Sequence, residues 1–495
     1  MIIIGNIKRF NSGHFRQLFA ATAANLVSFT YGVYTGWSAT VTPKLQDPKT
    51  TPLETVMTNE SLSWMCSWGM FSAIFGSFIW GFVANKYGRK ATGFFTMIPY
   101  LVSWIILLQI KTETALMVSR FLGGLGGSGA AINIPLYVAE ISNKDMKAGL
   151  GSLFILMYNI GVLYAYIFGV FVSYDSFNVA CLMITVLYMF VWCCVPESPV
   201  FYIQQNQMDY AKKSVQWLQG KDTVDNELSE LTNSGDHMSA ATTADYTDKR
   251  LIKALIIGIV FQSGTQLSGI NVILMDTVNI FKRSGGTLGS EYCTMLVGVV
   301  QVVGSIIAVC TVNRASRKFF LISTYALTSL ALITIGCCFY ATNVMLITQG
   351  TGIIPVLSLS LHVMAFSLGL GMVPYIIYAE IFPANVRNMC MSILMVWNNV
   401  LGFAVLKGYP KMTELMGEFG YYWMFGLVCL AIVPFTYFFV PETKGKTIKD
   451  ILEDLLLWFP DFGNRNTVDI TTKTEQKICD NKNNHKLTKQ INDII

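Results

Sequence analysis

Charged residues are scarce in this chain. They make up 13% of its 495 residues, whereas hydrophobic residues make up 53%, and a typical soluble domain carries about 25% charged residues. This small number of charged residues could not cover the surfaces of several soluble domains. Much of the surface is therefore expected to face lipid. The net charge of +5 is not gathered into basic clusters, which argues against a nucleic-acid partner. We therefore expect an integral membrane protein.

Histidine is also rare, and cysteine lacks the spacing of metal ligands. Of the four histidines, only His362 lies in an apolar run, where we expect a packed, hydrogen-bonded side chain or, alternatively, a transport role. Most of the eleven cysteines lie inside apolar runs and are expected to be small core residues. No nucleotide-binding loop and no nucleophile with a base stands out. An enzyme, a metal site and a cofactor are therefore not expected.

Long apolar runs dominate what remains. A membrane helix needs roughly 20 apolar residues to cross the hydrocarbon layer. The chain carries six such runs, a polar interval, and six more. We predict an all-α membrane protein with spans at 17–38, 64–84, 91–110, 115–138, 149–172, 178–195, 251–281, 292–312, 319–340, 350–378, 388–408 and 420–440.

The polar stretches divide the chain and orient it. We expect a six-helix bundle in 1–195, a linker with an amphipathic helix in 196–250, a second six-helix bundle in 251–440 and a tail in 441–495. Basic residues gather in the loops after spans 2, 4, 8 and 10 and in the tail, so the positive-inside rule places both termini in the cytoplasm. The sequon at Asn59 then lies outside, where glycosylation can occur.

Three short motifs recur in the same order in both sets of six spans. Asn85-Lys-Tyr-Gly-Arg-Lys90 matches Asn313-Arg-Ala-Ser-Arg-Lys318, and Pro135-Leu-Tyr-Val-Ala-Glu140 matches Tyr375-Ile-Ile-Tyr-Ala-Glu380. Val195-Pro-Glu-Ser likewise matches Val440-Pro-Glu-Thr. Such an internal repeat predicts two pseudo-symmetric bundles that provide alternating access to a site between them.

The repeated motifs place arginine and glutamate at the cytoplasmic ends of the spans. Pairs such as Arg89 with Glu140 and Arg317 with Glu380, together with Glu197 and Glu442, would latch the two halves on the cytoplasmic side when the outside is open; the alternative is ordinary positive-inside charge and helix capping. The full set of latch candidates is Arg89, Glu140, Glu197, Arg317, Glu380, Arg387 and Glu442.

With these motifs the chain resembles the sugar porter family of the major facilitator superfamily, from about Leu18 to Asp454. The resemblance rests on Gly81-x3-Asn-Lys-x-Gly-Arg-Lys90, Arg120-x3-Gly124-x-Gly126, Pro196-Glu-Ser-Pro199, Gln266-Leu-Ser-Gly-Ile-Asn271 and Pro441-Glu-Thr-Lys-Gly445. Within the family the chain is most similar to the insect trehalose-transporter branch, through Gly36-Trp-Ser38, Pro43-Lys-Leu45, Thr277-Val-Asn-Ile-Phe-Lys282 and Glu380-Ile-Phe-Pro-Ala384. The resemblance implies the major facilitator fold and sugar transport.

The resemblance also implies a set of sugar-binding residues. Side-chain amides suit sugar hydroxyls because they both donate and accept hydrogen bonds. Gln262 and Gln266 are one turn apart, but Asn271 joins their face only if the helix bends or unwinds near Gly269. For each amide the alternative is an ordinary bond between helices. The implied residues are Gln262, Gln266, Asn271, Gln301, Tyr375 and Asn398.

Several positions depart from the family pattern. Ile155 stands where the family has a hexose-binding glutamine, Thr265 replaces the first glutamine of a pair, and Asn399 replaces a tryptophan, with Trp397 two residues earlier. Each lost polar contact to a buried substrate costs about 1–3 kcal/mol. Trehalose and a hexose such as glucose both remain open as substrates.

The energy source is the last question. Tyr34 stands where proton-coupled members carry an aspartate, which favours facilitated diffusion. Asp276 lies in an apolar segment, and intramembrane acids are functional candidates, so a proton-coupled symporter that uses Asp276 is the alternative; a hydrated position or a partner such as Lys282 would make it structural. Arg120, inside span 4, is expected to be a structural cation. A non-transporting sugar sensor is a further alternative. We expect a monomer in the cell membrane.

Overall fold

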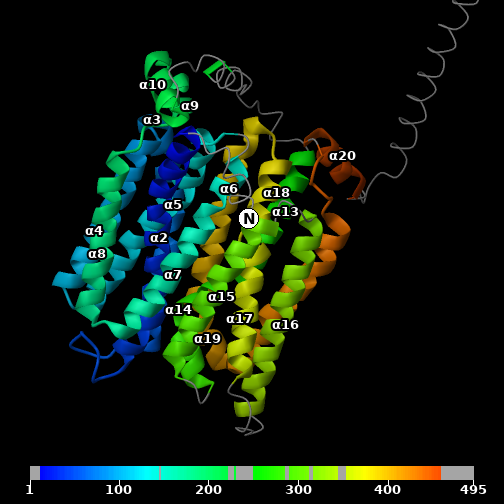
Figure 1. The fold of residues 1–495 in the computed structure, drawn as a ribbon. Coiled ribbons are helices and arrows are strands. Elements are labelled where there is room, and N and C mark those ends of the chain that lie inside the picture. The colour runs from blue at the N-terminus through cyan, green and yellow to red at the C-terminus, as the bar shows by residue number, and fades with distance from the viewer. Residues whose placement is uncertain are drawn as a thin grey trace, which may run out of the picture.

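The computed structural model describes residues 12–143, 146–220, 228–229, 249–284, 289–311, 316–343, 353–446 and 448–458, and these residues contain helices and no strand. The long helices lie side by side in one bundle (Figure 1). The chain is thus an all-α, multi-pass membrane protein.

The first half of the chain supplies six long helices and the five-residue α6. They are α2 (Ser12–Gln46), α3 (Asn59–Tyr87), α4 (Arg89–Gln109), α5 (Glu113–Ile141), α6 (Lys147–Gly151), α7 (Leu153–Phe171) and α8 (Tyr174–Cys193).

Threonine and serine begin several of these helices. Thr58 accepts a hydrogen bond from the backbone N–H of Ser61 at the start of α3, and Thr112 and Ser173 cap α5 and α8 in the same way. Such caps satisfy backbone donors that would otherwise lack a partner at a helix start.

The second half repeats the arrangement with more interruptions. Its helices are α13 (Lys249–Leu267), α14 (Ile270–Arg283), α15 (Ser290–Thr311), α16 (Arg317–Asn343), α17 (Ile354–Ala365), the π-helix η2 (Phe366–Leu370), α18 (Val373–Ile381) and α19 (Ala384–Phe439).

Within the described residues, ten segments are long and apolar enough to cross a membrane. Two of the twelve predicted spans are not among these ten as separate segments. The first is α2, which is 35 residues long. The second comes from Met389–Phe439, which counts as one segment but contains a non-helical Gly417. The predicted spans 11 and 12 are therefore present, although a single glycine separates them where we expected a longer loop.

Each half has its own apolar core. One cluster of buried residues lies entirely between Ala20 and Leu218, and the other lies mainly between Leu251 and Leu455. Large apolar side chains such as Phe78, Phe82 and Phe190 are more than half exposed on the outside of the bundle, as lipid-facing residues are. The structure therefore has two helical bundles, each with its own core.

The halves meet through three helix pairs: α2 with α14, α3 with α19, and α7 with α15. In the repeat, α3 corresponds to α15 and α7 to the first part of α19. If each helix is replaced by its counterpart in the other half, the α3–α19 pair therefore becomes the α15–α7 pair. The interface between the halves is pseudo-symmetric, as the repeated motifs predicted.

Short helices mark one end of the bundle, which we call the linker end. α9 (Pro199–Gln204), α10 (Met208–Gln219) and α20 (Ile448–Trp458) lie there (Figure 1). The opposite end is the far end. The amphipathic helix predicted from Met208 to Gly220 is α10, which ends at Gly220 in the left-handed conformation; the rest of the tail lies outside the described residues.

Candidate functional site

The break in span 7 organises the predicted sugar site. α13 ends at Leu267 and α14 begins at Ile270, and Gly269 between them has a φ of 73°. This left-handed conformation is open to glycine without the clash of a Cβ atom. The unwinding that Asn271 requires is therefore present at the predicted glycine.

The break brings three of the five predicted amides together. The Asn271 side chain donates a hydrogen bond to Gln266 Oε1 at 2.7 Å, and Gln266 Nε2 donates to Asn398 Oδ1 at 2.9 Å. Gln266 is only 4% exposed. We call Gln266, Asn271 and Asn398 the span 7 cluster. It belongs wholly to the second half.

Gln262 and Tyr375 form a second contact in the same half. The Tyr375 hydroxyl interacts with the Gln262 side chain. Gln262 is 1% exposed, yet its Nε2 has no hydrogen-bond partner among the described residues. A buried amide donor without a partner suits a site that a ligand completes.

Gln301, the sixth predicted residue, lies in a different cluster. Its Nε2 donates to Asn159 Oδ1 at 2.7 Å, and Asn159 Nδ2 donates to the hydroxyl of Ser305. Asn159 comes from α7 of the first half, whereas Gln301 and Ser305 come from α15 of the second. We call these three residues the α7–α15 cluster.

Sequence reasoning missed Asn159 and Ser305. Asn159 could have been found from its position, because it lies four residues after Ile155, at the family's sugar-binding position, and therefore on the same face of the helix.

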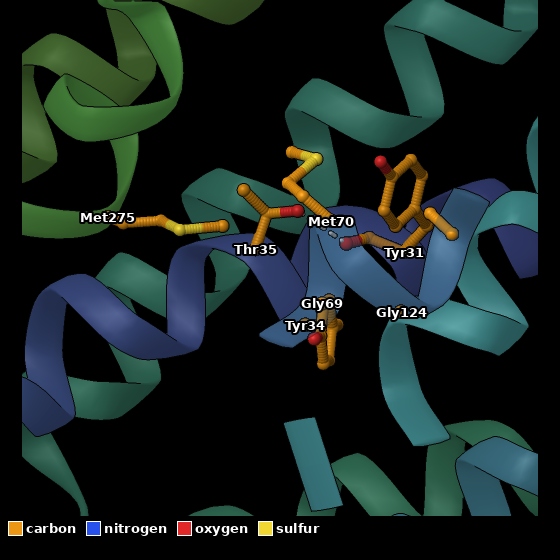
Figure 2. Close-up of a pocket in the computed structure, with 8 residues that line it drawn as sticks. Tyr31, Tyr34, Thr35, Gly69, Met70, Gly124 and Met275 are labelled. Carbon is orange, nitrogen blue, oxygen red and sulfur yellow. Dashed lines mark hydrogen bonds between the residues drawn. The ribbon is translucent and has the colours of Figure 1, made fainter. Parts of the chain in front are cut away.

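A narrow cavity lies between these helices (Figure 2). In the figure, Met275 reaches toward α2 from α14, while the other labelled residues come from the first half. The Tyr31 ring lies 5.2 Å from the Tyr158 ring, and Tyr31 also lies near Tyr375 of the second half. The cavity therefore lies beside the predicted amides. It is lined by Tyr31, Tyr34, Thr35, Gly69, Met70, Ala73, Gly124 and Met275.

Arg120 is bound by a backbone carbonyl, a hydroxyl and an aromatic ring rather than by a carboxylate. Its guanidinium donates to the Tyr34 backbone carbonyl at 2.9 Å and to Ser38 Oγ at 2.5 Å, and it lies 3.9 Å from the centre of the Tyr34 ring. The Tyr34 hydroxyl in turn donates to the Arg120 carbonyl at 2.5 Å. This cation–π and hydrogen-bonded pair stabilises a cation that is 1% exposed. Arg120 thus has the structural environment expected of it.

Asp276 is also paired, but not with Lys282. Its carboxylate accepts hydrogen bonds from Arg283 Nη2 at 2.7 Å and from Asn279 Nδ2 at 2.9 Å. Arg283 also binds Glu418 at 3.0 Å and the Tyr409 hydroxyl at 2.9 Å. The expected partner, Lys282, was therefore wrong, and the partner is the next residue, Arg283. These groups, with Asp276 only 17% exposed, form an ionic cluster at the far end of the second half.

The other departures from the family pattern turn away from the span 7 cluster. Thr265 donates to the Phe261 carbonyl of its own helix. Asn399 donates to Ser77 across the two halves at 3.3 Å. The Trp397 indole N–H donates to Ser263, and the residue is 38% exposed. Trp397 therefore does not replace the missing ring beside the amides.

At the linker end, the predicted ion pair of the first half is present. Arg89 Nη2 lies 2.8 Å from Glu140 Oε1, and the Arg89 side chain is only 3% exposed. Glu197 accepts hydrogen bonds from the backbone N–H groups of Arg89 and Lys90. Burial raises the pKa of Glu197, and these backbone hydrogen bonds offset part of that rise.

The second half repeats this network more loosely. Arg317 Nη2 lies 3.4 Å from Glu380 Oε1, and Glu442 accepts from the Ser316 hydroxyl and the Arg317 backbone N–H. Burial would raise the pKa of Glu442, but its hydrogen bonds outweigh that effect and hold the pKa below the ordinary value. Arg387 donates to the Phe382 carbonyl.

In this structure, which is closed at the far end, these contacts do not join the two halves. Arg89 pairs with Glu140 inside the first half, and Arg317 pairs with Glu380 inside the second half. The reason is geometric: each glutamate ends a helix that neighbours the arginine of its own bundle. The two networks therefore tie together the helix ends of each half separately.

His362 differs from its expected hydrogen-bonded state. It is fully buried in α17, as predicted, but neither ring nitrogen has a hydrogen-bond partner among the described residues. Leu359 and Val363, beside it on the helix, are apolar and buried.

The recorded hydrogen bonds between the halves run from the middle of the bundle to the far end. Besides the α7–α15 cluster, Tyr166 donates to the Leu274 carbonyl at 3.0 Å, and Asn279 donates to Gln46 at 3.1 Å. Close to the far end, Lys407 lies 4.0 Å from the centre of the Trp64 ring. The far end is therefore closed.

A family model described as "Sugar (and other) transporter" matches residues 17–455. The chain belongs to the sugar transporter family. This membership confirms the family resemblance, and the family consists of transporters rather than enzymes.

Two curated relatives within this family are named facilitated trehalose transporter Tret1. The relative from Aedes aegypti is 29% identical over 440 residues, which is 88% of this chain and 54% of the relative. The relative from Culex quinquefasciatus is 30% identical over 442 residues, which is 88% of this chain and 85% of the relative. The chain thus spans only about half the length of some relatives it matches.

Solved structures agree on the fold of this family member. An inward-open structure of the xylose transporter XylE from E. coli matches with a TM-score of 0.73 at 22% identity, covering 88% of this chain and 98% of that one. A partially occluded inward-open structure of the same transporter also matches with a TM-score of 0.73. Both support the two-bundle major facilitator fold.

Proposed function

We propose that the chain carries a sugar across the membrane by facilitated diffusion, with trehalose and a hexose such as glucose as the candidate substrates. The observation that carries this proposal is the span 7 cluster at the broken helix. Gln266, Asn271 and Asn398 present uncharged donors and acceptors in the membrane interior. Such groups match sugar hydroxyls and avoid the cost of burying a charge.

Alternating access follows from the two bundles. Residues 1–195 would rock against 251–440, with 196–250 as the connecting linker and 441–495 as the tail. Gln262, Gln266, Asn271, Gln301, Tyr375 and Asn398 would contact the sugar. The ion-pair networks at Arg89 and Arg317 would keep the helix ends of each bundle together during this movement.

The basic loops support a cytoplasmic linker end with both termini inside the cell. The far end, which is closed in this structure, then faces outward, so the structure represents an inward-facing state. Asn59 is exposed at the far end and accepts a hydrogen bond from Gln46 through Oδ1. Its side-chain nitrogen would be the glycosylated atom. We propose a monomer in the cell membrane, without a nucleic-acid partner or cofactor, because one chain contains both halves of the pathway.

The trehalose branch is supported by the printed names of the two insect relatives. Passive transport is supported by two contacts. Arg120 is bound by Tyr34 instead of an acid, and Asp276 is held in an ion pair with Arg283. Proton coupling through Asp276 and a sensor without transport are therefore less favoured.

The test is uptake of labelled trehalose and labelled glucose into liposomes that contain the purified chain, with and without an imposed pH gradient. We expect saturable uptake of one sugar that the pH gradient does not stimulate, and exchange when the same sugar is present inside. Liposomes without protein are the control. Absence of uptake of both sugars would contradict the proposed function.

A further inference from the structure

The α7–α15 cluster joins the two halves through buried polar side chains. Asn159 is 3% exposed, Gln301 is fully buried and Ser305 is 1% exposed. Asn159 belongs to the first half and the other two to the second. Polar groups in this position are costly unless their hydrogen bonds are complete.

The hydrogen bonds of this cluster are not complete. The Gln301 side-chain N–H donates to Asn159 Oδ1, the Asn159 side-chain N–H donates to Ser305, and the Ser305 hydroxyl donates to the Gln301 backbone carbonyl. Gln301 Oε1 remains buried without a hydrogen-bond partner among the described residues. The missing partner must be a donor, and a hydroxyl group satisfies this requirement while its oxygen can also accept.

The cluster is also continuous with the central cavity. Tyr158 precedes Asn159 on α7, and its ring lies 5.2 Å from that of Tyr31, which lines the cavity. Tyr31 lies near Tyr375, and Tyr375 lies beside Gln262. Aromatic side chains thus connect Asn159 of the first half with the amide site of the second half.

We propose that Asn159 and Ser305, together with Gln301, bind one hydroxyl of the transported sugar. The hydroxyl donates to Gln301 Oε1 and accepts from the Asn159 amide and the Ser305 hydroxyl when the halves move and the bond between Asn159 and Ser305 opens. This inference rests on the proposed sugar transport and adds to it a ligand from the first half, Asn159. Ile155, one turn earlier on α7, offers only an apolar side chain at its position.

A simple clamp between the halves is the competing explanation, and the chain offers a matched control for it. Asn399 also uses its side-chain amide to bond across the halves, to Ser77. If Asn159 acted only as a clamp, replacing either asparagine with leucine would have the same type of effect. Both variants would change the transport rate but would leave the contribution of each sugar hydroxyl to the KM unchanged.

The experiment measures KM and maximal rate for the wild type, Asn159→Leu, Ser305→Ala and Asn399→Leu in liposomes. The substrates are the transported sugar and its monodeoxy analogues, each lacking one hydroxyl. Ser305→Ala is the milder change and keeps the test valid if Asn159→Leu is not folded. Recovery of monodisperse protein checks folding.

For the wild type we expect one monodeoxy analogue to have a KM about tenfold higher than the parent sugar. Asn159→Leu and Ser305→Ala should raise the KM of the parent sugar and remove the penalty for that same analogue. Asn399→Leu should keep the penalty.

The proposal is overturned if both cluster variants keep the wild-type pattern across the analogues. It is also overturned if the wild type transports neither trehalose nor glucose. In that case the proposed function fails at the first measurement, before any variant is compared.

Discussion

Replacing Asp276 with asparagine tests whether this acid couples transport to protons or stabilises the far end. The carboxylate accepts from Arg283 and Asn279. Asparagine keeps the shape and one acceptor oxygen, so the substitution removes mainly the charge from these contacts. We expect transport to continue, and we expect its response to outside pH to stay as in the wild type.

The loss of stability can be worked out from the contacts. A hydrogen bond to a charged group contributes about 1.5–3 kcal/mol, compared with about 1 kcal/mol for a neutral one. Losing the charge on two such bonds would therefore cost about 1–4 kcal/mol. Arg283 is 40% exposed and keeps its contact with Glu418, and solvent screens the pair. The expected cost is thus about 1–2 kcal/mol.

Two measurements check this expectation: thermal unfolding of the purified protein in detergent, and sugar uptake at acidic and neutral outside pH. Glu418→Gln is the matched control, because Glu418 binds the same arginine. Both variants should melt at a lower temperature than the wild type and should transport sugar at both pH values. Acid-stimulated uptake in the wild type that is lost in Asp276→Asn and kept in Glu418→Gln would refute the structural role.

Three further predictions concern the site and the linker end. Gln266→Leu should raise the KM for sugar about tenfold or more, since it removes the side-chain amide, one donor and one acceptor, that is proposed to bind sugar hydroxyls; an unchanged KM in uptake assays would contradict its role. Gly269→Ala should lower the melting temperature, because its φ of 73° costs about 1–2 kcal/mol for other residues, whereas Gly149→Ala, with open space around it, should not. The linker-end glutamates should respond oppositely to acid in thermal unfolding measurements. The stability advantage of the wild type over Glu442→Gln should shrink as pH falls through the lowered pKa of Glu442, below 4.5. Relative to Glu197→Gln, the wild type should instead gain stability as pH falls through the raised pKa of Glu197, above 4.5; the same trend for both glutamates would be inconsistent with the two networks.

The ten membrane segments were predictable because each needs only a long apolar run, and such runs are local features of the sequence. The repeat was also predictable, since Arg89 and Arg317 lie in matching motifs. The break at Gly269 followed from helix geometry, because Asn271 could not otherwise reach the face of Gln266.

The partners of polar residues could not be predicted in the same way. Asp276 binds Arg283 rather than Lys282 because a seven-residue separation, about two helical turns, returns to the same face of a helix. The pairing of Asn159 with Gln301 depends on how two helices from different halves approach each other, which no local pattern records. The same limit explains the latch: matching arginines and glutamates do not reveal whether a pair closes within one half or between the two.

The interrupted helices divide mechanical roles between the halves. In the first half, α2, α3 and α5 each run for 29 residues or more without a change of helix type. In the second half, the equivalent elements include the break at Gly269 and the π-helix Phe366–Leu370. Backbone amides beside such breaks lack the regular helical hydrogen bonds that resist opening. Hydrogen exchange should therefore be uneven, with fast-exchanging amides concentrated at these two joints. We therefore expect the first half to move as a rigid body during each transport cycle, with bending concentrated at the two interrupted helices of the second half.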